Sequence, residues 1–194
     1  MMMMSDSFVA IVLLVFTAFY VKQQNSEVET VTSSFDNRQY IVRSLPNKEK
    51  AANLLAQMNK RLQILVKHMS EEDTEANEED VIRLVDNFDP DSISEGTEKS
   101  NYTSYSINKG EKIVFCVRSK EENLKLIDIN TLMYVAIHEL GHLMTKEIGH
   151  PPEFWDNFKI LLKESIKIGL YTKVDYSKAP VKYCGMEIKS SIVH

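Results

Sequence analysis

The feature that constrains this chain most is the segment 135–150, VAIHELGHLMTKEIGH. It places the pattern H-E-x-x-H, at His138, Glu139 and His142, inside a run that is apolar nearly all round, as in a buried helix. Burying two imidazoles and a carboxylate without partners would cost several kcal/mol. Chance gives only about 0.01 such motifs in a chain of this composition. The segment therefore predicts a buried helix built around a polar site.

The spacing within this segment predicts a metal site. Residues i and i+4 project from one face of a helix, so His138 and His142 can bind the same tetrahedral ion. Glu139 lies beside them, where it can accept a proton from a water molecule. These residue types indicate zinc as the cofactor and Glu139 as a catalytic general base. The alternative is a pair of core histidines with ordinary hydrogen bonds.

A third ligand is expected from the residues that follow. His150 comes directly after Gly149, just beyond the expected end of the helix, where the chain can fold back toward the metal. Glu164 is the second candidate, because another group of zinc proteases takes its third ligand from a later helix. Glu147 and Glu153 are weaker candidates.

The remaining periodicities predict interleaved helices and strands. Helices are expected over 47–69, 81–88, 132–146 and 152–168, strands over 39–43 and 181–188, and a hairpin from 102–107 and 111–118 with a turn at 108–110. This order indicates an α+β fold with a small mixed sheet. Gly141, inside the active-site helix, is expected where a neighbouring element approaches closely. Phe154 and Phe158, spaced i and i+4, are expected to pack in the core beneath the metal site.

The N-terminus differs in composition from the rest. Residues 8–21, FVAIVLLVFTAFYV, contain a single polar residue, and with the residues before them they reach the length of about 20 that a spanning helix needs. We expect an N-terminal transmembrane anchor over 1–22, a polar linker over 23–37 and a folded domain over 38–194. A cleaved signal peptide and a buried core helix are the alternatives.

Charge and cysteine content limit the function classes. The formal net charge is −5, so direct binding of nucleic acid by this chain alone is not expected. Two cysteines, Cys116 and Cys184, exclude a four-cysteine zinc site. They leave open one disulfide or two buried thiols.

Two stretches of the sequence resemble a known family. The segment 107–120, INKGEKIVFCVRSK, and the segment 138–158, HELGHLMTKEIGHPPEFWDNF, are similar to the WLM-domain metallopeptidases, relatives of the SprT-type proteases. The resemblance implies a zincin-like fold, zinc bound by His138, His142 and His150, and Glu139 as the base. The gap between His142 and His150 is two residues longer than the family's usual spacing.

Together these observations predict a membrane-anchored zinc-dependent endopeptidase, in a host or virion membrane, that hydrolyses proteins or peptides. One alternative is a non-enzymatic membrane or virion protein with a structural zinc site, and another is a protease that acts on DNA–protein crosslinks, as the family implies. The intact Glu139 favours an enzyme, because a structural site needs only the histidines. Tyr134 or Tyr183 is expected to stabilise the oxyanion. The strand 112–118 is expected to pair with an extended peptide.

Overall fold

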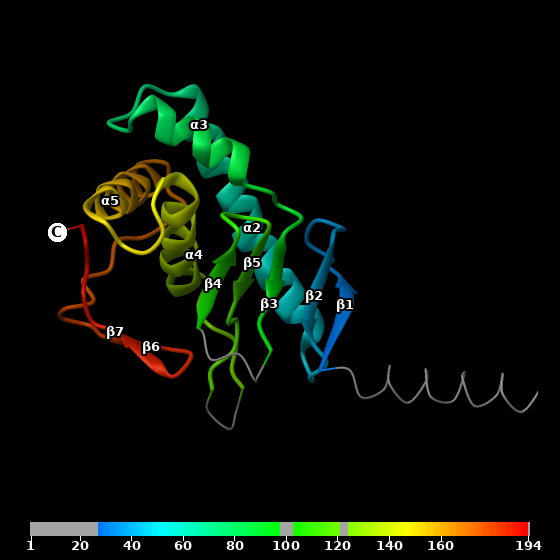
Figure 1. Ribbon diagram of the computed structural model, residues 1–194. Coiled ribbons are helices and arrows are strands. Elements are labelled where there is room, and N and C mark those ends of the chain that lie inside the picture. Colours follow the sequence, from blue (N-terminus) through cyan, green and yellow to red (C-terminus); the bar gives the residue numbers. More distant parts are fainter. Residues whose placement is uncertain (1–26, 98–102, 121–123, 194) are drawn as a thin grey trace, which may run out of the picture.

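A mixed sheet of short strands forms one layer of the structure. The computed structural model describes residues 27–97, 103–120 and 124–193 (Figure 1). Across the five-stranded sheet of that part, the strands follow the order β1 (Val28–Thr32), β2 (Gln39–Arg43), β3 (Ile93–Glu95), β5 (Lys112–Phe115) and β4 (Ser104–Ile107). The β1–β2 and β4–β5 pairs are antiparallel, whereas β2–β3 and β3–β5 are parallel. The strands β1 and β4 are therefore the two edges.

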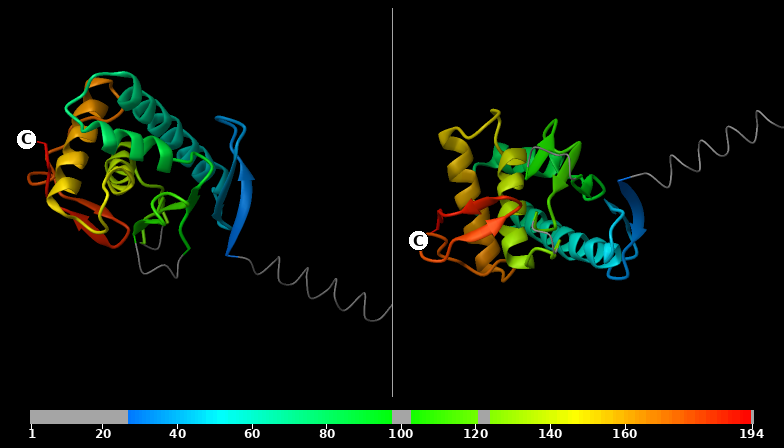
Figure 2. Two further views of the ribbon diagram at one scale, coloured as in Figure 1. Left: turned by 45° about the horizontal axis from the view of Figure 1, so that its top comes forward. Right: turned by 90° about the horizontal axis from the view of Figure 1, so that it is seen from below.

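The long helix α2 (Lys48–Glu71) covers one face of this sheet (Figures 1 and 2). Apolar residues recur along it at helical spacing and are buried, as the sequence predicts. On β2, burial alternates, so Tyr40 and Val42 face the core while Ile41 is exposed. This packing builds the core on which the other helices rest.

Three further helices complete the core. They are α3 (Glu78–Asn87), α4 (Ile129–Met144) and α5 (Pro152–Lys167). Asn77 and Asp128 cap α3 and α4, each accepting hydrogen bonds from backbone N–H groups of the first turn. The helix α4 contacts α2, α3, α5 and β4, which makes it the buried centre of the fold. The expected α+β class and its mixed sheet are thereby confirmed.

The chain closes with a small hairpin, here called the cover hairpin, formed by β6 (Val181–Tyr183) and β7 (Met186–Ile188). Its turn residues Cys184 and Gly185 both have positive φ, 49° and 88°. A disulfide joins Cys184 to Cys116, just after β5. One disulfide, the first of the two possibilities left open by the sequence, is thus the one found.

Three segments differ from the sequence-based expectation. β1 lies inside 23–37, which reads as a polar linker, because its valines and threonines favour a strand and it pairs with β2 along its whole length. β3 lies in a polar connection, where three residues suffice for a strand because both neighbours supply hydrogen bonds. The expected final strand over 181–188 is instead the cover hairpin, because the chain turns at Cys184 and Gly185.

The structure contradicts the predicted membrane localisation. Within residues 27–97, 103–120 and 124–193, no helix combines the length and the apolar character needed to cross a bilayer. The helix α2 is long enough but amphipathic, and α4, with 16 residues, is apolar but spans only about 24 Å, short of the roughly 30 Å hydrocarbon layer. The predicted anchor, residues 1–22, lies outside the described residues.

Candidate metal centre

The helix α4 brings two histidines together. His138 and His142 are one helical turn apart, and their ring centroids are 4.9 Å from each other. The buried apolar residues around the helix fix its rotation, and Asp128 fixes its start. Both imidazoles consequently lie on the face of α4 that borders the strand β4 and the residues following the helix.

A third histidine arrives from the segment after α4. This ligand loop, residues 145–150, leaves the helix at Thr145 and turns back through Gly149, which has a φ of 89°. The Nε2 atoms of His150 and His138 are 3.2 Å apart, and one ring nitrogen from each of the three histidines lies within 4.8 Å of the others. Two nitrogens bound at 2.0–2.1 Å to a tetrahedral ion would lie about 3.3 Å apart. The cluster is compatible with a metal ion.

The electrostatics of the cluster suit metal binding. Burial, followed by the charges of the other two histidines, lowers the pKa of His138 to about 3. Burial, His150 and Lys109 lower the pKa of His142 to about 4. Both rings are therefore neutral at pH 7, which is the form that binds metals. The backbone of Gly149 acts in the opposite direction and raises the pKa of His142, but by less than burial and the neighbouring charges lower it.

Glu139 lies next to this cluster. Its side chain shares two cavities with His138 and His150, although only 4% of the residue is exposed. Burial raises its pKa to about 8. In the metal-free protein the carboxyl group is mostly protonated at pH 7, and a nearby cation would favour its ionised form.

Aromatic side chains of α5 pack against the histidine rings. Phe154 is buried and stacks on His142, with ring centroids 4.5 Å apart. Phe158, also buried, meets His138 edge-on. A Cβ on Gly141 would come within 3.0 Å of Phe154, so glycine lets α5 approach α4 this closely. The expected core role of both phenylalanines and the close approach at Gly141 are confirmed.

Trp155 has a different position from its two phenylalanine neighbours. It is 44% exposed, and its ring stacks on His150 with centroids 5.4 Å apart and an interplanar angle of 25°. This contact holds the plane of the His150 imidazole from outside. The tryptophan therefore lies at the rim of the cluster instead of in the core.

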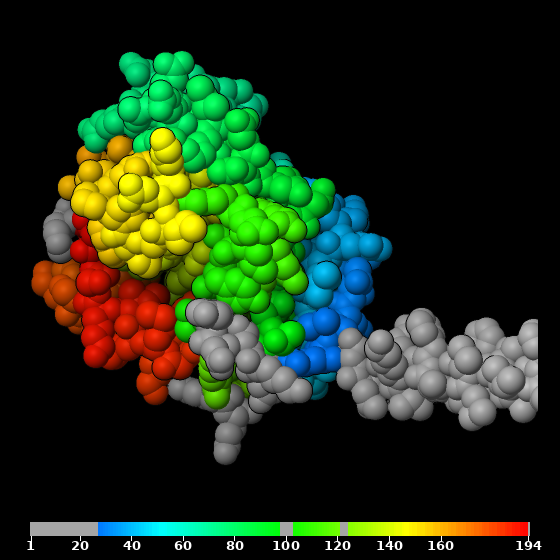
Figure 3. All heavy atoms as spheres, viewed as in Figure 1, coloured from blue at the N-terminus to red at the C-terminus, as the bar shows by residue number. Residues whose placement is uncertain are grey.

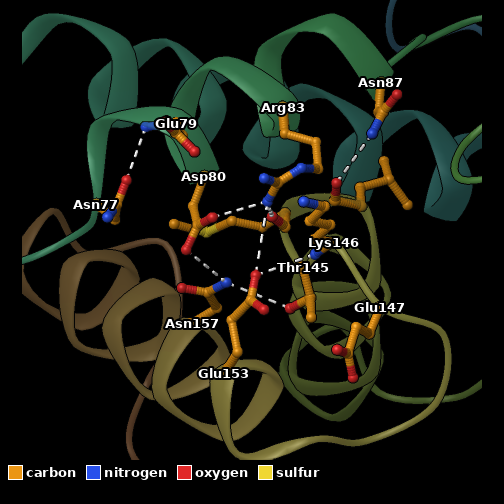
Figure 4. Close-up of polar contacts among 12 residues, drawn as sticks. Asn77, Glu79, Asp80, Arg83, Asn87, Thr145, Lys146, Glu147, Glu153 and Asn157 are labelled. Carbon is orange, nitrogen blue, oxygen red and sulfur yellow. Dashed lines mark hydrogen bonds and ion pairs between the residues drawn. The ribbon is translucent and has the colours of Figure 1, made fainter.

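The end of α4 is held by side chains that the sequence did not single out (Figure 4). Arg83 of α3 donates to the carbonyl of Met144 at 2.6 Å, and Asn87 donates to that of Leu143 at 3.0 Å. Lys109, from the β4–β5 turn, donates to further carbonyls in this region. These contacts join residues 33 or more positions apart, which leaves no periodic signal in the sequence.

The acidic alternatives for a third ligand lie elsewhere. Glu164 accepts a hydrogen bond at 2.7 Å from His68 of α2 and another from Lys167. Glu153 accepts from the backbone N–H of Lys146 and lies 3.6 Å from Arg83. Glu147 belongs to the ligand loop, but the cluster of possible ligand atoms comprises the three histidines without it.

The two tyrosines proposed as oxyanion donors occupy the same cavity as His138. The hydroxyl of Tyr183 is 2.7 Å from Ser104 Oγ, and that of Tyr134 donates to the carbonyl of Ser190 at 3.2 Å. Burial raises the pKa of Tyr183, which keeps its phenol protonated. Tyr183 comes from the cover hairpin, so this hairpin forms one side of the site.

Two cavities flank the cluster, each of about 360–370 Å³. The first is mostly apolar and is lined by α4, α5 and the cover hairpin, including Trp155 and Met186. The second lies between β4 and the ligand loop. Figure 3 shows the region of the ligand loop (yellow), that of β4 (green) and that of the cover hairpin (red) next to one another on one face.

The strand that borders the cluster is β4. From the sequence, the strand 112–118 is expected to pair with an extended peptide. In the structure β5 lies between β3 and β4, and both of its edges are already paired within the sheet. That prediction is wrong for β5. β4 pairs with β5 on one side only among the described strands, and its Ser104, Tyr105 and Ser106 line the second cavity.

The fold and the site define a class: an α+β protein with a three-histidine cluster and a buried glutamate in an H-E-x-x-H helix. The chain belongs to one family with "Uncharacterized protein R325" of Acanthamoeba polyphaga mimivirus, to which it is 35% identical over 187 residues, covering 95% of this chain and 93% of that protein. No protein-family model matches the chain.

Shorter matches come from two other viruses. "Uncharacterized protein 136R" of Invertebrate iridescent virus 6 is 37% identical over 83 residues, which are 42% of this chain and 44% of that protein. "Uncharacterized protein 042R" of Invertebrate iridescent virus 3 is 37% identical over 84 residues, 43% of this chain and 50% of that protein. Relatives of this chain are thus encoded by several viruses.

Among solved structures, the crystal structure of Wss1 from Saccharomyces cerevisiae matches with a TM-score of 0.49 and 19% identity, covering 66% of this chain and 86% of that one. A mutant of the same protein gives the same score and identity over 67% of this chain and 91% of that one.

Proposed function

We propose that this protein is a zinc-dependent metallopeptidase with His138, His142 and His150 as the metal ligands and Glu139 as the general base. The observation that carries the proposal is the three-histidine cluster beside a buried glutamate within one cleft. Three neutral imidazoles, with a fourth position left for water, are a ligand set of catalytic zinc sites. The sequence resemblance to WLM-domain metallopeptidases, with their zincin-like fold, supports the same ligands.

The chemistry follows from the positions of the side chains. Zinc, when bound, supplies a Lewis acid that lowers the pKa of a water molecule. Glu139 accepts the proton of the attacking water and later passes it to the leaving amine. Tyr183 would donate to the developing oxyanion, because it lines the cavity that His138 and Glu139 also line and its phenol is protonated.

An extended substrate would bind along β4. Among the described strands β4 pairs only with β5, so its other edge is the one where a peptide would add as a further strand, and β4 lies beside the cavity lined by His138 and Glu139. A peptide added to this edge passes the histidine cluster. This arrangement favours hydrolysis of unfolded or extended protein segments.

The test uses the full chain, loaded with zinc and mixed with an unstructured protein such as casein. We expect one zinc per chain and cleavage of the substrate. Glu139→Gln should keep the zinc and lose about 10²–10⁴ of the rate, since it removes the base but not the ligands. Glu72→Gln, an exposed change just after α2 and outside the cluster, is the matched control and should behave as the wild type.

Three results bear on this proposal. A folded wild type without bound metal would refute the metal centre. Full activity of Glu139→Gln would refute the assigned base. Bound zinc without hydrolysis by the wild type would leave the structural-zinc alternative. A protein crosslinked to DNA is the second substrate to include, because the WLM resemblance implies the crosslink-directed alternative, and preferential cleavage of it would favour that function.

A further inference from the structure

The turn between β4 and β5 carries a lysine that reaches into the end of α4. The ammonium group of Lys109 donates to three backbone carbonyls: those of His142 at 3.1 Å, Thr145 at 2.6 Å and Glu147 at 2.8 Å. One of these belongs to a histidine of the cluster, and the other two belong to the ligand loop. A single side chain therefore connects the helix that carries two histidines to the loop that carries the third.

The turn itself is seated firmly against α3. Asn108, Lys109 and Gly110 all have positive φ, 47°, 57° and 114°. A Cβ on Gly110 would lie 2.0 Å from the carbonyl oxygen of Asn87, so any larger residue would push the turn away from the end of α3. The lysine thus starts from a fixed backbone position.

We propose that Lys109 is a positioning residue of the metal centre, because its ammonium group fixes the ligand loop relative to α4 and so places His150 beside His138 and His142. This inference rests on the proposed metal centre. The same contacts act on His142 directly, since its own backbone carbonyl is one of the three acceptors.

The contacts argue against a direct role with substrate. A lysine ammonium has three N–H donors, and here three carbonyls accept from it. No proton is left to donate to a bound peptide, although Lys109 lines the cavity beside the histidines. Its positive charge at the C-terminal end of α4 also complements the helix dipole.

The geometry predicts which substitutions fail. Methionine in Lys109→Met keeps much of the length but removes every donor. Arginine in Lys109→Arg keeps the charge, but its planar fork does not match three carbonyls arranged around one ammonium. Lys112→Met is the matched control. Lys112 is an exposed lysine of β5, close to Lys109 in sequence, and it donates no hydrogen bond to the described residues of the ligand loop.

The experiment titrates Zn²⁺ into each full-length protein in competition with a chromophoric chelator, and records the visible absorption spectrum of the Co²⁺ form. Circular dichroism confirms that each variant is folded. We expect Lys109→Met to bind zinc about 10–100-fold more weakly than the wild type and to show an altered Co²⁺ spectrum, as for other outer contacts of metal ligands. Lys109→Arg should lie between these two, and Lys112→Met should equal the wild type.

The outcomes separate the two proposals. If the wild type binds no metal, the metal centre itself is refuted and this inference falls with it. If the wild type binds zinc and Lys109→Met binds it equally well with an unchanged Co²⁺ spectrum, the positioning role is refuted, even when that variant melts at a lower temperature. If Lys109→Met does not fold, the zinc affinity of Lys109→Arg decides in the same way.

Discussion

The ligand loop and the cover hairpin line different cavities beside the histidine cluster, and they are held by different kinds of bond. The loop is fixed by hydrogen bonds from Lys109 and by the contacts of Arg83 at the preceding helix end. The hairpin is tied by the disulfide between Cys116 and Cys184 and by side-chain hydrogen bonds, among them one between the hydroxyls of Tyr183 and Ser104 and one from Thr103 Oγ1 to Met186 Sδ.

The difference follows from what each segment carries. The loop brings a candidate ligand, His150, whose nitrogen must be placed to within a fraction of an ångström, and several directional bonds can do this. The hairpin brings no histidine and covers the apolar cavity, so one covalent tether with weaker side-chain contacts is enough to keep it in place. We therefore expect perturbation of the loop to change metal affinity, and loss of the disulfide that ties the hairpin to change stability and leave metal affinity unchanged.

Removing the disulfide should give the largest effect on stability. The bond spans 68 residues of sequence, and a loop of that size corresponds to about 4 kcal/mol in the chain-entropy description. Cys116→Ser combined with Cys184→Ser should lower the free energy of unfolding by about this amount in a denaturant titration. Zinc affinity of the folded double variant should remain that of the wild type, and a loss as large as that of Lys109→Met would break the comparison.

Arg83→Met tests the loop side through α3. Arg83 donates to Asp80 and to the carbonyl of Met144, and hydrogen bonds to charged groups contribute about 1.5–3 kcal/mol. We expect about 2 kcal/mol of lost stability together with a several-fold weaker zinc affinity, measured by the same two titrations. Arg38→Met, which removes an exposed ion pair with Asp91, is the control and should cost less than about 1 kcal/mol without affecting zinc.

Glu139, which belongs to neither segment, should make the stability of the metal-free protein depend on pH. Because burial raises the pKa of Glu139 to about 8 from an ordinary 4.5, the stability gained from its protonated form is complete below about pH 4.5 and is lost as the pH rises through 8. Between pH 7 and pH 9 the metal-free wild type should lose about 1–2 kcal/mol relative to metal-free Glu139→Gln. Parallel melting temperatures of the two proteins across this range would contradict the assigned environment.

Asn87→Ala should have the smallest effect. It removes one neutral donor to the carbonyl of Leu143, worth about 1 kcal/mol. Because Asn87 makes one neutral hydrogen bond whereas Arg83 makes charged ones, zinc affinity should change by less than the Arg83→Met variant changes it. A change as large as that of Lys109→Met would place the control of the loop in α3 and not in the β4–β5 turn.

The sequence predicts the parts of the fold that have local signals. Helical periodicity identifies α2, α4 and α5, and the Asn-Lys-Gly turn identifies the β4–β5 hairpin. The strands β1 and β3 are not predicted because they are short, and because pairing with neighbouring strands favours their extended conformation more than their own residues do. The sequence alone does not decide between a disulfide and two free thiols, because the distance between two cysteines so far apart along the chain cannot be inferred from it.

The candidate site divides in the same way. H-E-x-x-H is a local pattern, so His138, Glu139 and His142 can be read directly, and His150 follows from its place after a glycine. Lys109 cannot be found like this, because it contacts carbonyls more than thirty positions away that no side-chain pattern marks. What orients the histidines depends on tertiary packing and becomes visible only in three dimensions.

The disulfide has a further consequence under the proposed peptidase activity. His138, Glu139, His142 and His150 all lie between Cys116 and Cys184, within one covalent ring. A single self-inflicted cut anywhere inside that ring would open the backbone but leave both products joined, so neither half of the cluster could diffuse away. Such nicked molecules would migrate as one species on a non-reducing gel and as two fragments after reduction.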